Sequence, residues 1–416
     1  MAVGGGPFAS TGLAVSRPPP PHNPESHQRN FTATACPHPN PQRSSSEVMS
    51  SVITAAIGAP AALARIFLSP IFSGPLLFSI TFYPDAVRSA IGFVADKLLP
   101  HQLATTFLHY ASPLLLSSST TVTVLQAAVV LGVLRRANQM LNTMASNSWR
   151  FGPAPGWDWP NEIAVVTGGS SGIGKGIVQR LSALGVRVVV LDVQKPPADL
   201  SVNPRVSFYR CDVTSSQSVA AAAAAIRSDI GQPSILVNNA GIANPMPILQ
   251  TQEAFLRKIM GVNLMSMWFT TQQFLPDMIK QDKGHVMTMA SIASFVALPT
   301  AADYSATKAG ALAFHESLTS ELKHQYKAPN VLTSIVHPHF VRTPLLEGIS
   351  ARLEKAGVQL LTSELIAEEA VELIKSRRGG QLVIPGSVAA VSGIRGWPTW
   401  LQELVRDTVG KTTAGL

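Results

Sequence analysis

The stretch Ile163-Ala164-Val165-Val166-Thr167-Gly168-Gly169-Ser170-Ser171-Gly172-Ile173-Gly174 contains the pattern that decides the fold. Its apolar start predicts a buried strand, and Ile177 to Leu181 predicts the helix that follows. A strand, a glycine turn and a helix begin a dinucleotide-binding unit, because glycines let the backbone approach a pyrophosphate and the helix N-terminus offers free N–H groups. A glycine motif alone is weak evidence, but its context here fits. The candidate cofactor residues in this turn are Thr167, Gly168, Ser170, Ser171, Gly172, Ile173 and Gly174.

The same turn also fits part of a second phosphate-binding pattern. Gly169 to Lys175 has the glycine and lysine spacing of a nucleoside-triphosphate loop. That loop requires a Ser or Thr after the lysine to hold magnesium, and this chain has Gly176 there. The sequence therefore favours a dinucleotide over a nucleoside triphosphate.

An acidic residue follows at the distance expected for ribose binding. Asp192 ends the strand-like run Val188 to Leu191 and lies 18 residues after Gly174. A carboxylate at this place accepts hydrogen bonds from an adenosine ribose and repels a 2′-phosphate. The sequence favours NAD, while Lys175 and Lys195 keep NADP open as the alternative.

Two later segments carry candidate site residues at strand ends. Asn238-Asn239-Ala240-Gly241 follows the predicted strand Ile235 to Val237, where Asn and Gly suit a sharp turn beside a cofactor cleft. Tyr304 and Lys308 are four residues apart in a predicted helix, so their side chains lie on one face. A lysine ammonium beside a phenol favours the phenolate and so predicts a lowered tyrosine pKa.

The chain from Trp157 onward alternates predicted strands and helices. This alternation predicts an α/β fold, a Rossmann-type doubly wound parallel sheet of about seven strands. The predicted strands are 163–167, 186–192, 206–211, 235–239, 285–291, 331–337 and 381–385. The predicted helices include 216–230, 252–280, 302–326 and 363–377.

Together these segments resemble the short-chain dehydrogenase/reductase family over residues 160 to 386. The glycine motif matches at Gly168, Gly172 and Gly174, and the Asn-Asn-Ala-Gly motif matches at 238–241. The other matches are Asp212 with Val213, Asn263, Ser291, Tyr304, Lys308 and the loop residues Pro338, Val341 and Thr343. His339 stands where the family has glycine after the proline.

The resemblance implies catalytic and cofactor-binding roles for these residues. Tyr304 would be the general acid or base, and Ser291 would donate a hydrogen bond to the substrate oxygen. Lys308 would lower the pKa of Tyr304 and hold the nicotinamide ribose, and Asn263 would order a water chain behind Lys308. Asp212, Val213, Asn239, Ala240, Gly241, Tyr304, Lys308, Pro338, Val341 and Thr343 would border the cofactor.

A narrower resemblance is visible in Phe274 to Met278, Gly284 to Val286 and Phe314 to Leu322. These segments look like the membrane-attached retinol dehydrogenase and lipid-droplet hydroxysteroid dehydrogenase branch. That branch implies NAD(P)-dependent hydride transfer with a lipophilic alcohol or ketone, such as a retinoid, steroid or long-chain alcohol. The alternatives are an NADPH-dependent ketoreductase of lipid or secondary-metabolite synthesis and a non-catalytic lipid-surface scaffold.

Composition restricts the other function classes. Only 13% of the residues are charged, 46% are hydrophobic, and the net charge is +8. Without a basic stripe in the catalytic region, we expect no nucleic-acid partner. His337 and His339 have no carboxylate or Cys partner, so we expect no metal. Two cysteines, Cys36 and Cys211, provide no disulfide framework and favour a reducing compartment.

The N-terminal part predicts a tail and an anchor. Residues 1–48 are rich in Pro and Ser and predict a disordered tail. Residues 49–150 form a hydrophobic helical region, in which 113–134 is the best membrane span. Arg135 and Arg136 follow directly, so the catalytic domain should face the cytosol, at the endoplasmic reticulum or a lipid droplet. The alternative is an amphipathic appendage packed on the domain.

The remaining segments complete the predicted organisation. The catalytic domain is predicted over 157–390, followed by an amphipathic helix and tail over 391–416. The apolar segment 344–362 either caps a substrate pocket or packs as ordinary helix core. The long helices of this family often pair, so a homodimer is a further expectation by analogy.

Overall fold

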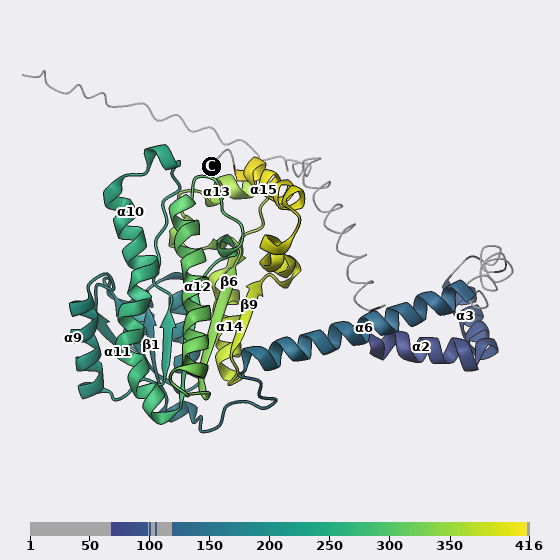
Figure 1. The fold of residues 1–416 in the computed structure, drawn as a ribbon, viewed down its shortest axis with the longest axis horizontal. Helices are drawn as coiled ribbons and strands as arrows, with labels where there is room; N and C mark the ends of the chain where they lie inside the picture. The colour runs from purple at the N-terminus through teal and green to yellow at the C-terminus, as the bar shows by residue number, and fades with distance from the viewer. Residues whose placement is uncertain (1–67, 99, 101–104, 106–118, 414–416) are drawn as a thin grey trace, which may run out of the picture. The chain divides into compact units, whose positions relative to one another are not determined.

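The computed structural model describes residues 68–98, 100, 105 and 119–413. The predicted tail over 1–48 lies outside the described residues, and so does the start of the predicted membrane span, 113–118. The described part contains a set of N-terminal helices and a larger α/β domain (Figure 1).

The α/β domain is built on a seven-stranded sheet in the order β3-β2-β1-β4-β5-β6-β9. All six strand pairs are parallel. The strands are β1 (Ile163–Thr167), β2 (Arg187–Asp192), β3 (Val206–Arg210), β4 (Ile235–Asn238), β5 (Gly284–Met289), β6 (Val331–Pro338) and β9 (Gly380–Ile384). The predicted Rossmann-type parallel sheet is confirmed, because these strands coincide with the predicted ones to within two residues at each end.

Helices cover both faces of this sheet (Figure 1). One core cluster joins β1, β4 and β5 to α9, α11 and α12, and a second joins the opposite sheet face to α7 and α14. Every residue of β1, β4, β5 and β6 is buried, as expected for central parallel strands covered on two sides. The helices are α7 (Gly172–Ala183), α8 (Ala198–Ser201), α9 (Ser216–Asp229), α10 (Glu253–Met260), α11 (Ser266–Gln281), α12 (Ala302–His324) and α14 (Ser363–Lys375).

The predicted single helix over 252–280 is wrong in one respect. A π-helical turn, Gly261–Met265, separates α10 from α11. Such turns often occur at functional sites, and this one carries the buried Asn263. Apolar periodicity continues through the turn, so the sequence pattern did not reveal it.

The remaining elements of the domain lie before β1, in the loops that follow the strands, and at the C-terminal end. These are η2 (Trp159–Asn161), η3 (Ile248–Gln250), η5 (Ile292–Ser294), η6 (Pro344–Leu346), α13 (Ser350–Lys355), η7 (Gly386–Gly396) and α15 (Thr399–Thr413). A second sheet pairs β7 (Val341–Arg342) with β8 (Leu361–Thr362) in parallel. The C-terminal helix packs Val405 and Val409 on the domain and leaves Trp400 and Leu404 exposed.

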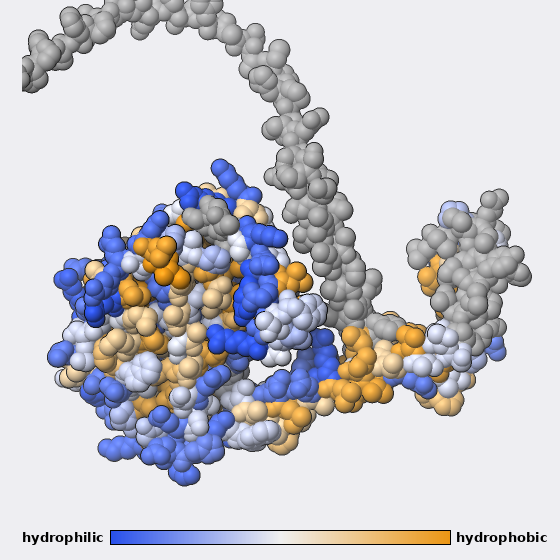
Figure 2. All heavy atoms as spheres, turned by 45° about the horizontal axis from the view of Figure 1, so that its top comes forward, coloured by the Kyte–Doolittle hydropathy of each residue, from blue (hydrophilic) through white to orange (hydrophobic). Residues whose placement is uncertain are grey.

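The N-terminal helices are α2 (Pro70–Phe82), α3 (Pro84–Leu98) and α6 (Ser119–Ser146). Ile80 of α2 and Leu125 of α6 form the centre of a small apolar cluster. Many other apolar side chains of this region are exposed, and Figure 2 shows hydrophobic residues on its surface. Within the described residues, α6 is the one helix that is long and apolar enough to cross a membrane. It continues 12 residues beyond the predicted end at 134.

Candidate active site

The turn after β1 is shaped by glycines, whose backbone angles or close contacts disfavour a side chain. Gly168 and Gly172 have φ of +64° and +52°, the left-handed region that favours glycine. A Cβ on Gly168 would lie 2.9 Å from the Cα of Ala240, and one on Gly174 would lie 2.2 Å from the carbonyl oxygen of Gly168. The turn therefore brings bare backbone and the N-terminus of α7 to one edge of the sheet, which suits a diphosphate.

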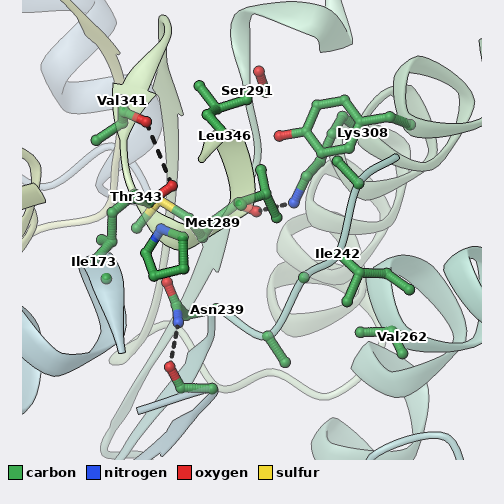
Figure 3. A pocket seen from close by; sticks show the side chains of 18 of the residues that line it. Ile173, Asn239, Ile242, Val262, Met289, Ser291, Lys308, Val341, Thr343 and Leu346 are labelled. Atoms are coloured by element: carbon green, nitrogen blue, oxygen red, sulfur yellow. Dashed lines mark hydrogen bonds between the residues drawn. The ribbon is translucent and has the colours of Figure 1, made fainter. Parts of the chain in front are cut away.

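The end of β4 is fastened to this turn by side-chain hydrogen bonds. The hydroxyl oxygen of Thr167 accepts hydrogen bonds from the backbone N–H groups of Asn239 and Ala240, both at 3.0 Å. The amide of Asn239 donates to the carbonyl oxygens of Thr167 and Gly168, at 3.0 and 3.1 Å (Figure 3). These contacts hold the two predicted cofactor segments side by side.

Asp192 lies at the carboxyl end of β2 and lines the same cleft. Its carboxylate accepts hydrogen bonds from the backbone N–H groups of Ser170 at 3.1 Å and Gln194 at 3.0 Å. Lys175, one of the two cations that kept NADP open, forms a salt bridge of 2.9 Å with Asp199. The cleft thus presents a carboxylate where the adenosine ribose is expected, and one nearby ammonium is already paired.

Three of the four predicted catalytic side chains, which follow β5 or belong to α12, meet at the wall of the cleft. The ammonium of Lys308 donates to the carbonyl oxygen of Met289 at 2.8 Å and lies 5.6 Å from the centre of the Tyr304 ring (Figure 3). Ser291 follows β5 and caps the short helix η5, accepting from the backbone N–H of Ala293 at 3.2 Å. Ser291, Tyr304 and Lys308 all line the cleft.

The protonation of Tyr304 differs from the expectation. Burial raises the pKa of Tyr304, and the hydrogen bond with the Ser291 side chain lowers it in part. Burial also lowers the pKa of Lys308 to about 8. The expected lowering of the Tyr304 pKa by Lys308 is not found in this structure, because desolvation dominates and the ammonium donates to Met289 instead.

Asn263 lies behind the wall rather than on it. Its side-chain oxygen accepts from the backbone N–H of Ile242 at 2.8 Å, and its amide donates to the carbonyl oxygen of Ile242 at 2.9 Å. The amide also approaches the hydroxyl of Thr307 at 3.3 Å. Asn263 therefore joins the π-helical turn to the loop after β4 and to α12, one residue away from Lys308.

The loop after β6 closes the cofactor side. Pro338, His339, Val341 and Thr343 line the cleft. A Cβ on Gly172 would lie 3.4 Å from the side chain of Thr343, so the loop approaches the glycine turn closely. The His339 side chain, which replaces the expected glycine, is partly buried, and burial lowers its pKa.

Together these segments form a cleft of about 850 Å³ at the carboxyl ends of the strands. Its far side is mostly apolar, with Ile242, Leu298, Pro299, Phe340, Leu345, Leu346 and Ile349 on the wall. Only the first part of the predicted cap over 344–362 reaches the cleft. Leu353 and Leu361 pack in the protein instead, so both readings of that segment hold for different parts of it.

Most of the predicted cofactor residues line the cleft. These are Gly168, Ser171, Gly172, Ile173, Asp192, Asp212, Val213, Asn239, Ala240, Gly241, Tyr304, Lys308, Pro338, Val341 and Thr343. Thr167, Ser170 and Gly174 are not on the wall and instead hold the turn in shape.

Sequence reasoning missed the loops on the substrate side. Ile242 to Pro245 and Leu298 to Ala301 line the cleft, and the backbone N–H of Met246 donates to the carbonyl oxygen of Thr300 at 2.6 Å. Both loops directly follow predicted strands, β4 and β5, at their carboxyl ends. That position was the available signal, because ligands in such sheets bind beyond those ends.

Comparison with known proteins identifies the family. A sequence profile of the short chain dehydrogenases matches residues 162–354. Dehydrogenase RED2 of Cochliobolus heterostrophus is 42% identical over 180 residues, which cover 43% of this chain and 68% of that protein. Estradiol 17-beta-dehydrogenase 11 of Macaca fascicularis is 31% identical over 201 residues, covering 47% and 67%. This chain belongs to the short-chain dehydrogenase/reductase family.

A solved structure agrees with this assignment. The 3-ketoacyl-(acyl-carrier-protein) reductase of Brucella melitensis, complexed with NADH, superposes with a TM-score of 0.50 and 25% identity, covering 55% of this chain and 98% of that one. The predicted family and its hydroxysteroid dehydrogenase branch are confirmed. The chain is an NAD(P)-dependent short-chain dehydrogenase/reductase that acts on CH–OH groups.

Proposed function

We propose that this short-chain dehydrogenase/reductase is a membrane-associated enzyme that uses NAD to interconvert a lipophilic alcohol and its ketone or aldehyde. The observation that carries the proposal is the position of Ser291, Tyr304 and Lys308. All three line the same cleft. The glycine turn and Asp192 lie on one side of this cleft, and the opposite side is mostly apolar.

The proposed mechanism assigns each side chain one task. A bound nicotinamide supplies the hydride acceptor for oxidation and the donor for reduction. During oxidation the deprotonated Tyr304, a phenolate, takes the proton of the substrate hydroxyl, and during reduction the Tyr304 phenol donates that proton back to the substrate oxygen. The Ser291 hydroxyl donates a hydrogen bond to the substrate oxygen as its negative charge grows. The ammonium of Lys308, held by Met289, keeps a positive charge beside the phenol.

The wall of the cleft supports a lipophilic substrate. Leu345, Leu346 and Ile349 form one part of the wall, and Ile242 and Leu298 form another. Burial of apolar substrate surface there contributes about 25 cal/mol per Å². The related estradiol dehydrogenase is named for a steroid alcohol, which belongs to this substrate class.

Three observations support NAD over NADP. Asp192 places a carboxylate beside the ribose end of the cleft, where a 2′-phosphate would be repelled. The Lys175 ammonium forms a salt bridge with Asp199, and this pairing weakens its attraction for a 2′-phosphate. The related reductase structure holds NADH.

The helix α6 supports membrane association. It is 28 residues long, and apolar side chains such as Leu131 and Leu134 are more than half exposed. Its first part, from Ser119 to Leu134, carries no charge, and by length and composition the helix can cross the hydrocarbon of a bilayer. Arg135 and Arg136 lie on its C-terminal side, which favours a catalytic domain that faces the cytosol, at the endoplasmic reticulum or a lipid droplet.

A turnover screen of the full chain in detergent micelles tests the proposal. Long-chain alcohols, retinol and steroid alcohols are offered with NAD and with NADP, and their carbonyl counterparts with NADH and NADPH. The Tyr304→Phe variant is the blank. We expect turnover with the lipophilic substrates and a preference for NAD. A preference for NADPH and ketones would favour the ketoreductase, and cofactor binding without any turnover would favour the scaffold.

A further inference from the structure

Three histidines of the catalytic domain are shielded from solvent: His285 and His337 are fully buried, and His315 is partly buried. His285 lies on β5, His315 on α12 and His337 on β6. Burial lowers the pKa of each one, to about 3, 4 and 4, so all three are neutral at physiological pH. His337 is the one of the three whose ring bonds the backbone of a residue with a proposed catalytic role.

The hydrogen bonds of His337 fix its tautomer. Its Nε2 lies 3.2 Å from the side-chain amide nitrogen of Gln381 on β9, and its Nδ1 lies 3.0 Å from the carbonyl oxygen of Ser291. An amide nitrogen can only donate and a carbonyl oxygen can only accept. The imidazole Nε2 therefore accepts from Gln381, and the Nδ1–H donates to Ser291.

The surroundings of His337 hold the ring in this state. The ring is fully buried and lies 4.5 Å from the centre of the Phe295 ring. The titratable groups that face it are Lys308 and His315, both on α12. The Lys308 charge disfavours a second proton on His337, so Nε2 remains an acceptor.

The bond to Ser291 is part of a wider fastening of the catalytic turn. The carbonyl oxygen of Ser291 also accepts from the backbone N–H of Ser294 at 3.0 Å. The Ser294 hydroxyl donates to the carbonyl oxygen of Lys308 at 2.8 Å. In this way the turn that carries Ser291 is held by β6, β9 and α12 at once. His337 links the main chain of Ser291 to both strands, and the Ser291 hydroxyl donates to the carbonyl oxygen of Pro338 on β6 at 3.4 Å.

We propose that His337 is a positioning residue, which holds the main chain of Ser291 so that the serine hydroxyl points at the substrate oxygen and at the Tyr304 phenol. The inference rests on the proposed catalytic role of Ser291. It assigns no contact with substrate or cofactor to His337 itself. Its consequence is specific, because the Ser291 hydroxyl lowers the pKa of Tyr304, and a displaced hydroxyl would lose that effect.

Two substitutions of similar polarity separate the bond to Ser291 from the presence of the histidine. In His337→Asn the amide nitrogen takes the place of Nδ1 and can still donate to Ser291. In His337→Gln the amide takes the place of Nε2, keeps the contact with Gln381 and loses the bond to Ser291. We expect His337→Asn to keep kcat within about threefold and His337→Gln to lower it about tenfold, since a small misplacement of a catalytic group is costly.

The pKa of the Tyr304 phenol is a readout of the Ser291 position that does not depend on turnover. Its titration is followed by ultraviolet absorbance in each variant, after subtraction of the curve of Tyr304→Phe. We expect the phenol pKa to rise in His337→Gln and to stay unchanged in His337→Asn. The matched control is His285→Gln, which removes a buried histidine that bonds Ser334 at 2.7 Å instead of the catalytic turn. It should leave the phenol pKa unchanged.

A double-mutant cycle completes the test. In the Ser291→Ala background, His337→Gln should change kcat by no more than about twofold and should leave the phenol pKa unchanged. The reason is that the two residues act through one hydroxyl. Equal phenol pKa values in the native chain, His337→Asn and His337→Gln would overturn the inference. Absence of turnover in the native chain would instead overturn the proposed function, while the titration still decides the role of His337.

Discussion

The N-terminal helices and the catalytic domain place the same kinds of side chain in opposite environments. In α6, Leu131 and Leu134 are 57% and 59% exposed, whereas Leu181 of α7 is completely buried. The helices leave apolar surface free that the sheet domain covers on both faces. Large exposed apolar surfaces mark sites of contact with another partner or a membrane. This difference in exposure supports the proposed contact of α6 with lipid.

Close contact through glycine occurs in both regions, with different results. Gly132 lets α6 approach the backbone of Leu68, since a Cβ there would lie 2.3 Å from the carbonyl oxygen of Leu68. Gly174 lets α7 approach Gly168 in the same way. In the first region the contact packs two helices together, and in the second it holds the glycine turn behind the cleft wall in shape.

The largest expected effect appears when one tyrosine in each region is replaced by phenylalanine: the catalytic domain should lose activity and the N-terminal helices should not affect it. Tyr304→Phe removes the hydroxyl that transfers the substrate proton, and we expect kcat to fall by about 10³-fold or more. Tyr83→Phe removes an exposed hydroxyl between α2 and α3 and should leave kcat unchanged. Initial rates in detergent provide the comparison, and titration with NADH checks that Tyr304→Phe still binds cofactor. Residual activity of Tyr304→Phe above a tenth of the native rate would contradict the assigned role.

Charges placed in the apolar surface of α6 test its contact with lipid. Val130, Leu131 and Leu134 are each replaced by Arg, and each charge costs about 2.5–3.5 kcal/mol within a membrane. We expect the variant to leave the membrane pellet after centrifugation while it keeps its kcat in detergent. The control is Val202→Arg, which alters an even more exposed apolar residue of the catalytic domain. A variant that still pellets with membranes would show that α6 is not the anchor.

Acid should destabilise the catalytic domain through its buried histidines. The folded-state pKa values of His285, His315 and His337 lie below the unfolded value of about 6.5, so the unfolded chain binds more protons at low pH. The stability that they contribute is complete above pH 6.5 and is lost as the pH falls toward 4. Each histidine contributes about 1.4 kcal/mol per pH unit.

Thermal melts between pH 7 and pH 5 measure this dependence. The melting temperature of the catalytic domain should fall with pH, and His285→Gln should make the dependence shallower. His324→Gln alters an exposed histidine at the end of α12 and should leave the slope unchanged. A melting temperature that is constant over this range would contradict the neutral state of the three rings.

The smallest expected effect is a change in the Kd for NADH, which should differ between substitutions at Gly174 and at Gly132. Gly174→Ala should raise the Kd for NADH about tenfold, because its Cβ forces the glycine turn apart. Gly132→Ala should leave this Kd unchanged and weaken only the packing of α2 on α6. Fluorescence titration with NADH measures the first effect, and proteolysis of the N-terminal helices measures the second. Equal Kd values in both variants would mean that Gly174 does not shape the cofactor site.

The sequence predicted the catalytic domain well because its signals are local. The apolar runs of Ala164 to Val166 and Ile235 to Val237 are long enough to indicate buried strands by themselves. The spacing of Tyr304 and Lys308 predicts one helix face, and both residues line the cleft. The glycine turn and Asp192 were likewise recognisable from a few neighbouring residues.

Other features could not be predicted, because they join residues far apart in the chain. The π-helical turn at 261–265 carries Asn263, which bonds Ile242, 21 residues earlier in the chain. The pairing of Lys175 with Asp199 depends on how α8 packs beside α7. Asn263 and Thr167 could be recognised as site residues, but only the structure places them behind the cleft wall.

The sequence by itself determined which groups are available at the site. A glycine turn and the Asp192 carboxylate can bind a dinucleotide, and a serine, a tyrosine and a lysine can take part in the reaction. Only the tertiary structure decided the state of those groups. Burial raises the pKa of Tyr304 and lowers that of Lys308, and the bond from His337 to Ser291 crosses 46 residues of sequence. The reason is physical, since desolvation and hydrogen-bond geometry depend on which distant segments surround a side chain.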